Sequence, residues 1–564
     1  MLTWFVTTLQ KNAELAVFIA LAAGYYIGPK KIAGFGLGNG TATLLAGVVV
    51  GQLRIPISPP LKAFAFVLFL FAMGYKVGPQ FFAGLKREGL RQVMLGLFYA
   101  VLGLLASAGF AHAVHFNVAQ AAGLLAGSLT QPTTMGTSND AIDRLGLSPA
   151  KDRVFEEQLA VGFAVSYVVG TIVALIVCSR LIPFLLRFDL AEECRKLAAQ
   201  MGLKPDRQPG IFGAYNANAI RAVRVTETGL AGHRVGDIES DFERRGQRVF
   251  VAAIHRGEKI EPATPSDVVS TGDVIALAGP IDVIVAEAAG TEVNDPRLLD
   301  MLTIEELDVV VTNRTLDGLT VDGLFHGRAR GVVLKKITRA SIGIPVLPLT
   351  EIHVGDTLQL AGFLRAVEAA AKTAGYAVRP SPGADVVFMS IAIVIGSLVG
   401  VITVFAGGIP IALGAGVGAL LAGLVAGYLR SRFPTFGNVS PGALWVFESF
   451  SLTVFVAIIG IDAGPGFVPG VKTAGLELFL GGLLIPLICL VISAYFGTYV
   501  LKIRNVELCG ALAGADTSVA ALNALKDVAK SDLVTLGYTT PYAIGSIVLT
   551  VWGAVIVAIF ASQT

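Results

Sequence analysis

Two charged residues lie inside apolar segments, at matching places toward the two ends of the chain. Lys76 lies in FLFAMGYKVGPQFFAGLKREG (69–89), and Asp462 lies in FVAIIGIDAGPGFVPGVKTAG (455–475). A charge at the centre of a membrane costs at least about 2.5 kcal/mol, so charges retained there usually serve a function. Lys76 is expected to bind a substrate carboxylate, and Asp462 an ammonium group or Lys76 itself. In the alternative interpretation, both lie at segment ends and extend to the membrane surface.

Helix breaks are predicted beside both charges. Glycines lie two residues before and two residues after each charge, and a proline follows. Glycine and proline interrupt helices, which would turn backbone groups toward a polar cavity. The predicted hinge or helix-break positions are Gly74, Gly78, Pro79, Gly460, Gly464 and Pro465.

Small polar residues form a second pair of candidate sites. GSLTQPTT (127–134) places a proline where a helix begins, and GADTSV (514–519) offers Asp, Thr and Ser as N-caps. Opposed helix N-termini would bind carboxylates, because unpaired N–H groups and the helix dipole favour negative charge. With Lys76 and Asp462, the predicted substrate-binding residues are Ser128, Thr130, Gln131, Thr133, Asp516, Thr517 and Ser518.

Two alternatives accompany this second prediction. Thr130 and Asp516 could cap ordinary helices, which is their common role. Residues 137–140, Thr-Ser-Asn-Asp, could extend the polar lining or form an exposed loop.

These residues belong to two halves of the chain that repeat each other. LLAGVVVGQLR (44–54) returns as LLAGLVAGYLR (420–430), and SYVVGTIVALIV (166–177) returns as PYAIGSIVLTVW (541–552). With 54% hydrophobic and 15% charged residues, the chain holds apolar runs that only a bilayer accommodates. Spans are expected near 13–28, 40–53, 62–77, 89–111, 156–182, 385–405, 409–428, 443–461, 473–500 and 538–560, with broken elements at 119–147 and 506–530.

The predicted fold is a polytopic α-helical membrane protein with two inverted repeats, each of about five transmembrane helices plus a re-entrant hairpin. Lys and Arg accumulate on the cytoplasmic side of membrane proteins, and their distribution favours an external N-terminus. An odd number of spans per half inserts the halves in opposite directions, which is typical of secondary transporters. The N-terminus lacks a basic region and a cleavage site, so no removable signal peptide is expected.

The middle of the chain holds short β-branched strands and Gly-Asp turns. Gly272-Asp273 and Gly355-Asp356 each precede an apolar strand, and both stretches resemble the TrkA-C (RCK C-terminal) regulatory domain. The resemblance implies two small α/β domains that pair and bind a regulatory ligand. The expected division is 1–190 N-terminal transmembrane repeat, 191–217 linker, 218–285 first TrkA-C-like domain, 286–305 linker, 306–370 second TrkA-C-like domain, 371–384 linker and 385–564 C-terminal transmembrane repeat.

Together, the repeats and the inserted modules resemble the aspartate:alanine exchanger family of bacterial antiporters over nearly the whole chain. The resemblance implies one-for-one exchange of L-aspartate for L-alanine in the bacterial inner membrane, with residues 191–384 cytoplasmic. A close branch of that family exports succinate and other dicarboxylates. Repeat geometry and resemblance together favour a homodimer with elevator-like movement, and exchange of aspartate for alanine would move one charge.

Other functional classes fit the sequence less well. A cation channel would need a filter such as TVGYG, which is absent. An enzyme would need a nucleophile with a base, a metal-ligand spacing or a phosphate loop, and none is found. A sensor without transport would leave the polar breaks in both repeats unexplained. No cofactor, metal or nucleic-acid partner is expected, since the net charge is only +2 and the six histidines form no cluster.

Overall fold

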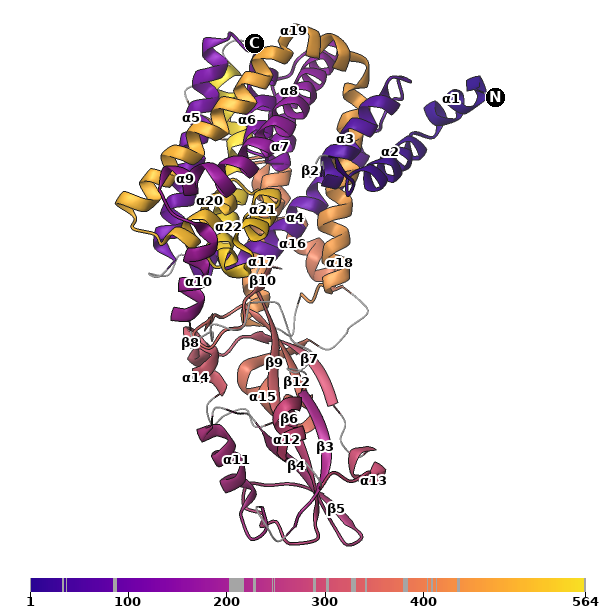
Figure 1. Cartoon of the computed structure of the whole chain (residues 1–564). Coiled ribbons are helices and arrows are strands. Elements are labelled where there is room, and N and C mark those ends of the chain that lie inside the picture. Colours follow the sequence, from indigo (N-terminus) through magenta and orange to yellow (C-terminus); the bar gives the residue numbers. More distant parts are fainter. Residues whose placement is uncertain are drawn as a thin grey trace. The chain divides into compact units, whose positions relative to one another are not determined.

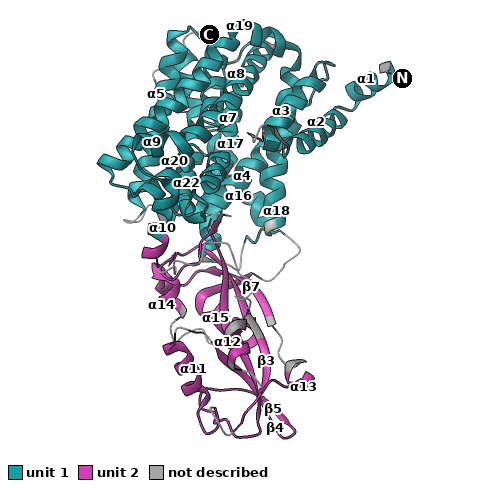
Figure 2. Cartoon of the chain, in the orientation of Figure 1, with its two compact units in different colours: residues 1–197, 339–342, 380–564 teal, residues 198–338, 343–379 magenta. Residues whose placement is uncertain are grey.

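The chain folds into two compact units (Figure 2): residues 1–197, 339–342 and 380–564 form the first, and residues 198–338 and 343–379 the second. The computed structural model describes residues 2–561, apart from 33–34, 37, 85–88, 202–217, 227–229, 246, 248, 288–290, 301–303, 326–330, 340–341, 379–383, 403, 407–408, 412 and 434–436.

The first unit is mostly helical, and each half contains a short apolar helix, a two-stranded pair, further helices and a helical hairpin in that order (Figure 1). The first half contains α1 (Leu2–Lys11), α2 (Ala13–Ile27), β1 (Lys31–Ile32), β2 (Phe35–Gly36), α3 (Gly38–Gly51), α4 (Pro59–Gly84), α5 (Leu90–Ala113), α6 (Val118–Ser128), α7 (Pro132–Asp143), α8 (Pro149–Ile176), π-helical η1 (Val177–Leu181), α9 (Ile182–Leu185) and α10 (Leu190–Gln200). The second half contains α16 (Val386–Gly400), β14 (Val404–Ala406), β15 (Ile409–Ile411), α17 (Ala415–Arg432), α18 (Pro441–Trp445), π-helical η4 (Val446–Phe450), α19 (Ser451–Tyr495), π-helical η5 (Phe496–Val500), α20 (Asn505–Ala515), α21 (Val519–Ala529), η6 (Asp532–Val534) and α22 (Thr535–Phe560).

Several helices are long and apolar enough to cross a membrane. Within the described residues, five helical runs meet that criterion: Pro59–Phe82, Leu90–Ala113, Ala150–Leu185, Gly442–Val500 and Asp532–Phe560. Shorter apolar helices, among them α2, α3, α16 and α17, accompany them. The prediction of a polytopic α-helical membrane protein is therefore confirmed.

The expected spans at 443–461 and 473–500 are joined by helix, because the backbone stays helical from Pro441 to Val500. Figure 1 shows a sharp bend in this run, and Pro465 and Pro469 lie inside its longest helix, α19. A proline removes one hydrogen bond and kinks a helix, whereas apolar surroundings keep the remaining backbone bonds internal. The two arms are therefore joined by a bent helix.

The predicted unwinding beside Lys76 and Asp462 is also wrong in this conformation. Helix α4 continues through Gly74, Gly78 and Pro79, and α19 continues through Gly460, Gly464 and Pro465. A Cβ atom added to any of these four glycines would lie within 3.0 Å of backbone atoms of a neighbouring helix. The glycines therefore let helix backbones approach closely, as small residues do in membrane proteins.

These close approaches join the first half to the second. Gly74 and Gly78 face the Leu420 and Leu424 carbonyls of α17, whereas Gly460 faces the Leu44 carbonyl of α3. The repeated segments thus make equivalent contacts: α4 packs on α17, and α19 packs on α3.

Within its described residues, the second unit holds two larger sheets and one further pair of short antiparallel strands, β8 and β11. The first, ordered β3-β6-β4-β5, belongs to a segment with β3 (Asn218–Arg224), α11 (Val235–Arg244), β4 (Phe250–Arg256), β5 (Lys259–Pro262), β6 (Val274–Pro280), α12 (Ile281–Glu287) and α13 (Pro296–Asp300). The second, ordered β10-β9-β12-β7-β13, belongs to a segment with β7 (Ile304–Val311), η3 (Arg314–Leu316), β8 (Leu319–Thr320), α14 (Val321–Phe325), β9 (Val332–Arg339), β10 (Ile342–Ile344), β11 (Glu351–Ile352), β12 (Thr357–Phe363), α15 (Leu364–Ala374) and β13 (Gly375–Val378).

The two Gly-Asp turns adopt the same geometry. Gly272 and Gly355 have φ angles of 90° and 98°, a region that favours glycine. Asp273 accepts from the Ser270 N–H at 2.8 Å, and Asp356 accepts from the His353 N–H at 2.9 Å. The Gly-Asp motif therefore forms the same type of turn at both places.

Some elements cross the expected domain boundaries. Helix α10 occupies part of the expected linker at 191–217, and most of the remainder lies outside the described residues. Strand β13 lies beyond the expected end of the second module at 370, where it pairs with β7.

Candidate functional site

Each half of the first unit contains a helical hairpin with a very short tip. Helix α6 ends at Ser128. Thr130, two residues later, has a left-handed φ of 53°, and the Gln131 N–H donates to the Ala126 carbonyl at 2.9 Å. In the second half, Thr517 also has a φ of 53°, and the Ser518 N–H donates to the Ala513 carbonyl at 3.0 Å. This arrangement closes a helix C-terminus and lets the next helix begin at once.

The two tips contact each other. The Thr130 hydroxyl donates to the Asp516 carbonyl at 2.7 Å, and the Thr517 hydroxyl donates to the Gln131 Oε1 at 3.0 Å. The Gln131 amide nitrogen donates in turn to the Ser546 carbonyl of α22 at 3.1 Å. The sequence segments that were expected to interrupt helices therefore meet, although they lie almost 400 residues apart along the chain.

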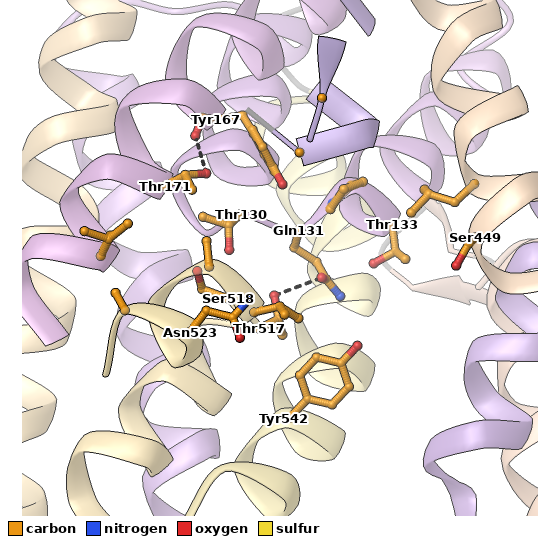
Figure 3. A pocket seen from close by; sticks show the side chains of 18 of the residues that line it. Thr130, Gln131, Thr133, Tyr167, Thr171, Ser449, Thr517, Ser518, Asn523 and Tyr542 are labelled. Carbon is orange, nitrogen blue, oxygen red and sulfur yellow. Dashed lines mark hydrogen bonds between the residues drawn. The ribbon is translucent and has the colours of Figure 1, made fainter. Parts of the chain in front are cut away.

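A cavity of about 850 Å³ lies at these tips, and we call it the tip pocket. Five predicted substrate-binding residues line it: Thr130, Gln131, Thr133, Thr517 and Ser518. Figure 3 shows side chains of both hairpins and of α8 and α22 around one space. Helices α7 and α21 both begin at this pocket, so their positive dipole ends face it.

Lys76 is connected to this pocket by its ion pair with Glu448. Its ammonium group contacts both carboxylate oxygens of Glu448, at 2.8 and 2.9 Å, and Glu448 lines the pocket. Both side chains are only 18% exposed. Glu448 lies in η4, and π-helical turns occur frequently at functional sites. Sequence reasoning did not identify Glu448 as the partner of Lys76.

Ser128 and Asp516 are not among the described residues that line the tip pocket. The Ser128 hydroxyl donates to the Leu125 carbonyl at 3.4 Å within its own helix. Asp516 is fully buried, and the Tyr99 hydroxyl donates to its carboxylate. Asp516 reaches the hairpin contact only through its backbone carbonyl.

The first two residues of the polar segment 137–140 neither line the tip pocket nor form an exposed loop. Thr137 and Ser138 are buried in α7, and their hydroxyls donate to the carbonyls of Thr550 at 2.7 Å and Gly553 at 3.2 Å. These hydroxyls attach α7 of the first half to α22 of the second.

Asp462 lies in a different cavity, of about 570 Å³, which we call the Lys62 pocket. There the Lys62 ammonium contacts Glu156 at 2.5 Å and Asn139 at 3.3 Å. Asp462 therefore lines the Lys62 pocket, whereas Lys76 contacts Glu448, which lines the tip pocket.

Several lining residues of the tip pocket were missed by sequence reasoning. Tyr167 and Tyr542 occupy equivalent positions of the repeated segments SYVV and PYAI, so the repeat carried a signal for both. Arg180 and Asn523 had no comparable signal as site residues. Within the described part of the chain, no group of three or more His, Cys, Asp or Glu is placed to hold a metal.

Comparison with known proteins agrees with a transport site. A family model described as a predicted permease membrane region matches residues 16–183 and 388–558. An uncharacterized transporter of Shewanella oneidensis is 38% identical over 99% of this chain and 100% of its own length. An uncharacterized transporter of Bradyrhizobium diazoefficiens is 38% identical over 91% of this chain and 100% of its own length. One from Francisella tularensis is 32% identical over 98% of both chains. No solved structure matches the chain.

Proposed function

Because the chain belongs to the Asp-Al_Ex family of permeases and is an integral membrane transport protein, we propose that it exchanges L-aspartate for L-alanine across the bacterial inner membrane. The observation that carries this proposal is the tip pocket, where the two hairpins meet beside the Lys76–Glu448 pair.

The pocket offers complementary groups to an amino acid. The N-termini of α7 and α21 favour a carboxylate, because backbone N–H groups and helix dipoles point there. A substrate carboxylate replaces Glu448 on the Lys76 ammonium, which leaves Glu448 to accept the substrate ammonium group. Alanine lacks the second carboxylate and leaves the helix N-termini unfilled, which leaves no full charge unpaired there.

Exchange between these substrates moves charge. Aspartate carries one negative charge at neutral pH and alanine carries none, so each cycle transfers one charge. Such a transfer is worth about 2.3 kcal/mol per 100 mV of membrane potential. The antiporter is therefore electrogenic.

Equivalent contacts in the two halves support an inverted-repeat mechanism. The left-handed threonines at both hairpin tips and the reciprocal glycine contacts are what two related halves require. We propose an elevator-type movement in a homodimer, with residues 191–384 in the cytoplasm and the two TrkA-C-like modules binding a regulatory ligand.

Purified protein in liposomes tests this function. Vesicles loaded with unlabelled L-aspartate, L-alanine, succinate or potassium chloride are supplied with radiolabelled L-aspartate. Uptake that requires internal aspartate or alanine, and that is lost in Lys76→Ala, supports the exchanger. Uptake driven by succinate but not by alanine identifies a dicarboxylate exchanger, and ion flux without exchange identifies a ligand-gated ion transport protein.

A further inference from the structure

The repeat register relates four charged residues. Lys76 matches Asp462 in the repeated segments, and the same register, continued toward the N-terminus without a gap, matches Lys62 with Glu448. The first half therefore supplies two lysines where the second half supplies two acids.

Two of these residues form an ion pair across the halves, and the other two line one pocket. Lys76 contacts Glu448 at the tip pocket, whereas Lys62 lines the same pocket as Asp462 and makes its own ion pair with Glu156 at 2.5 Å. A lysine of the first half and an acid of the second half are thus placed together twice, at positions that the repeat register exchanges. Lys62 is buried to a similar degree, with 13% of its side chain exposed.

The same two helices run from one pocket to the other. Residues 62 and 76 lie fourteen positions apart on α4, which is close to four turns, or about 21 Å, on nearly the same helix face. Glu448 and Asp462 are spaced identically on the continuous run of η4 and α19, with the order of the two pockets reversed.

Aromatic rings lie between the two ends. Phe66 and Phe455 line the Lys62 pocket and stack with centroids 4.6 Å apart. Three residues closer to the tip pocket on each helix, Phe69 of α4 and Leu452 of α19 line that pocket. In the repeat register, Phe69 matches Phe455 and Leu452 matches Phe66, so the walls of the two pockets are also equivalent.

The Lys62 pocket has a larger excess of acidic lining side chains than the tip pocket, which is lined by Glu448, Asp527 and Arg180. Its acidic lining side chains, Asp140, Asp143, Asp152, Glu156 and Asp462, outnumber its basic ones, Lys62 and Arg153. Such an excess disfavours a dianion and favours a ligand that carries an ammonium group.

We propose that the Lys62 pocket is the opposite mouth of the translocation pathway, an inference that rests on the proposed function. In this pocket Lys62 binds the carboxylate and Asp462 the ammonium group of a zwitterionic amino acid. The stacked Phe66 and Phe455 rings close the pathway between the mouths, and the acidic lining selects amino acids over dicarboxylates that lack an ammonium group.

Introduced cysteines test the proposal in proteoliposomes of uniform orientation. Ala63 lines the Lys62 pocket and Ser449 the tip pocket, and the repeat register matches these two positions. All four native cysteines are buried, so Ala63→Cys and Ser449→Cys supply the accessible thiols. An impermeant thiol reagent should label the two variants from opposite faces of the membrane.

Substrate protection then tests the ligand. L-alanine at ten times its apparent dissociation constant should slow labelling of Ala63→Cys about tenfold, because about nine-tenths of the sites are occupied. Succinate should give no protection. Asp462→Asn should remove protection by L-alanine, whereas Glu477→Gln, on the same helix but outside the described lining of both pockets, should retain it.

Labelling of both cysteines from one face would contradict the proposal that the two pockets open on opposite faces of the membrane. Absence of protection by L-alanine, or equal protection by succinate, would overturn the amino-acid site. Retained labelling of Ser449→Cys in the Asp462→Asn background reports that this variant is folded. Protection does not depend on transport: protection without exchange in the liposome assay refutes the proposed function, whereas exchange without protection refutes this inference.

Discussion

The Lys76–Glu448 pair combines a structural and a functional role, and mutation separates them. Lys76→Met leaves a mostly buried carboxylate without this partner, so we expect a loss of about 1–3 kcal/mol, less than for a fully buried pair. Adding Glu448→Gln removes the uncompensated charge and should restore most of that loss. Thermal unfolding in detergent measures stability, and liposome exchange should be absent in both variants.

The Lys76→Met/Glu448→Gln double variant tests whether charge compensation explains the pair. If it remained as unstable as Lys76→Met, mutual charge compensation would not explain the pair. If Lys76→Met still exchanged aspartate, Lys76 would not bind the substrate carboxylate.

Thr130 joins the two hairpins through one hydroxyl, which donates to the Asp516 carbonyl at 2.7 Å. Thr130→Val keeps the β-branched shape at the left-handed position but removes this donor. Depriving a buried carbonyl of that hydrogen bond should cost about 1–3 kcal/mol of stability. Thr130→Ser keeps the hydroxyl and should stay close to the wild type in thermal unfolding. Equal stability of the valine and serine variants would show that the bond between the tips contributes little.

At the scale of elements, helix packing depends on glycines at the crossings between the two halves. Alanine at Gly74 or Gly460 would place a Cβ within 3.0 Å of a carbonyl oxygen on α17 or α3. Overpacking of this kind typically costs about 1–3 kcal/mol, so both variants should lower the unfolding temperature. Gly109 of α5 is the matched control, because a Cβ there meets nothing within 4 Å. Gly109→Ala should stabilise the helix by up to about 1 kcal/mol.

Thermal unfolding of the three variants in detergent checks this prediction. A destabilised Gly109→Ala together with unaffected Gly74→Ala and Gly460→Ala would contradict the close-packing interpretation. Normal stability with slow transport in the latter two would instead revive the hinge interpretation.

The hairpin tips were predictable because their sequence signals are local. Proline after small polar residues at 127–134 and N-cap residues at 514–519 mark short breaks wherever they occur. The contact of Thr130 with Asp516 was less accessible, since it depends on how two distant hairpins pack.

The errors at Gly74 and Gly460 have a different cause. Propensities measured in water count glycine as a helix breaker, whereas in this unit it is the residue that permits contact with a second helix. Glu448 was missed as the partner of Lys76 for a related reason, because the pairing of helices between the halves sets that contact. The repeat register could have indicated it only once Lys62 had been included.

At the scale of the whole molecule, the two units rely on different forces. The first unit unites its halves through glycine contacts and buried hydroxyl bonds in apolar surroundings. The second unit is built around sheets, and one of its turns depends on the Asp273 carboxylate, which accepts from both Arg256 and the Ser270 N–H. The units should therefore respond differently to acid.

Acid should destabilise the second unit selectively. Burial opposes ionisation of Asp273, but bonds from Arg256 and Ser270 outweigh it, so the pKa of this carboxyl lies below its ordinary value. Burial likewise opposes ionisation of Asp295, but its bonds with His255 and the Leu298 N–H lower the pKa. Both carboxylates bind protons more weakly in the folded chain than in the unfolded one.

A lowered folded pKa fixes the sign of the pH dependence. Each carboxylate contributes its full stability above the ordinary value of about 3.9, and that contribution is lost as the pH falls through the folded pKa. We therefore expect cleavage within residues 250–280 by an acid-active protease to rise below about pH 4 in the full-length protein, while the helices of the first unit stay protected. Asp273→Asn should increase cleavage above that pH and flatten its pH dependence. Asp241→Asn, which removes only exposed ion pairs with Arg244 and Arg245, should behave like the wild type. Cleavage that is independent of pH in the wild type would show that these carboxylates do not hold the second unit together.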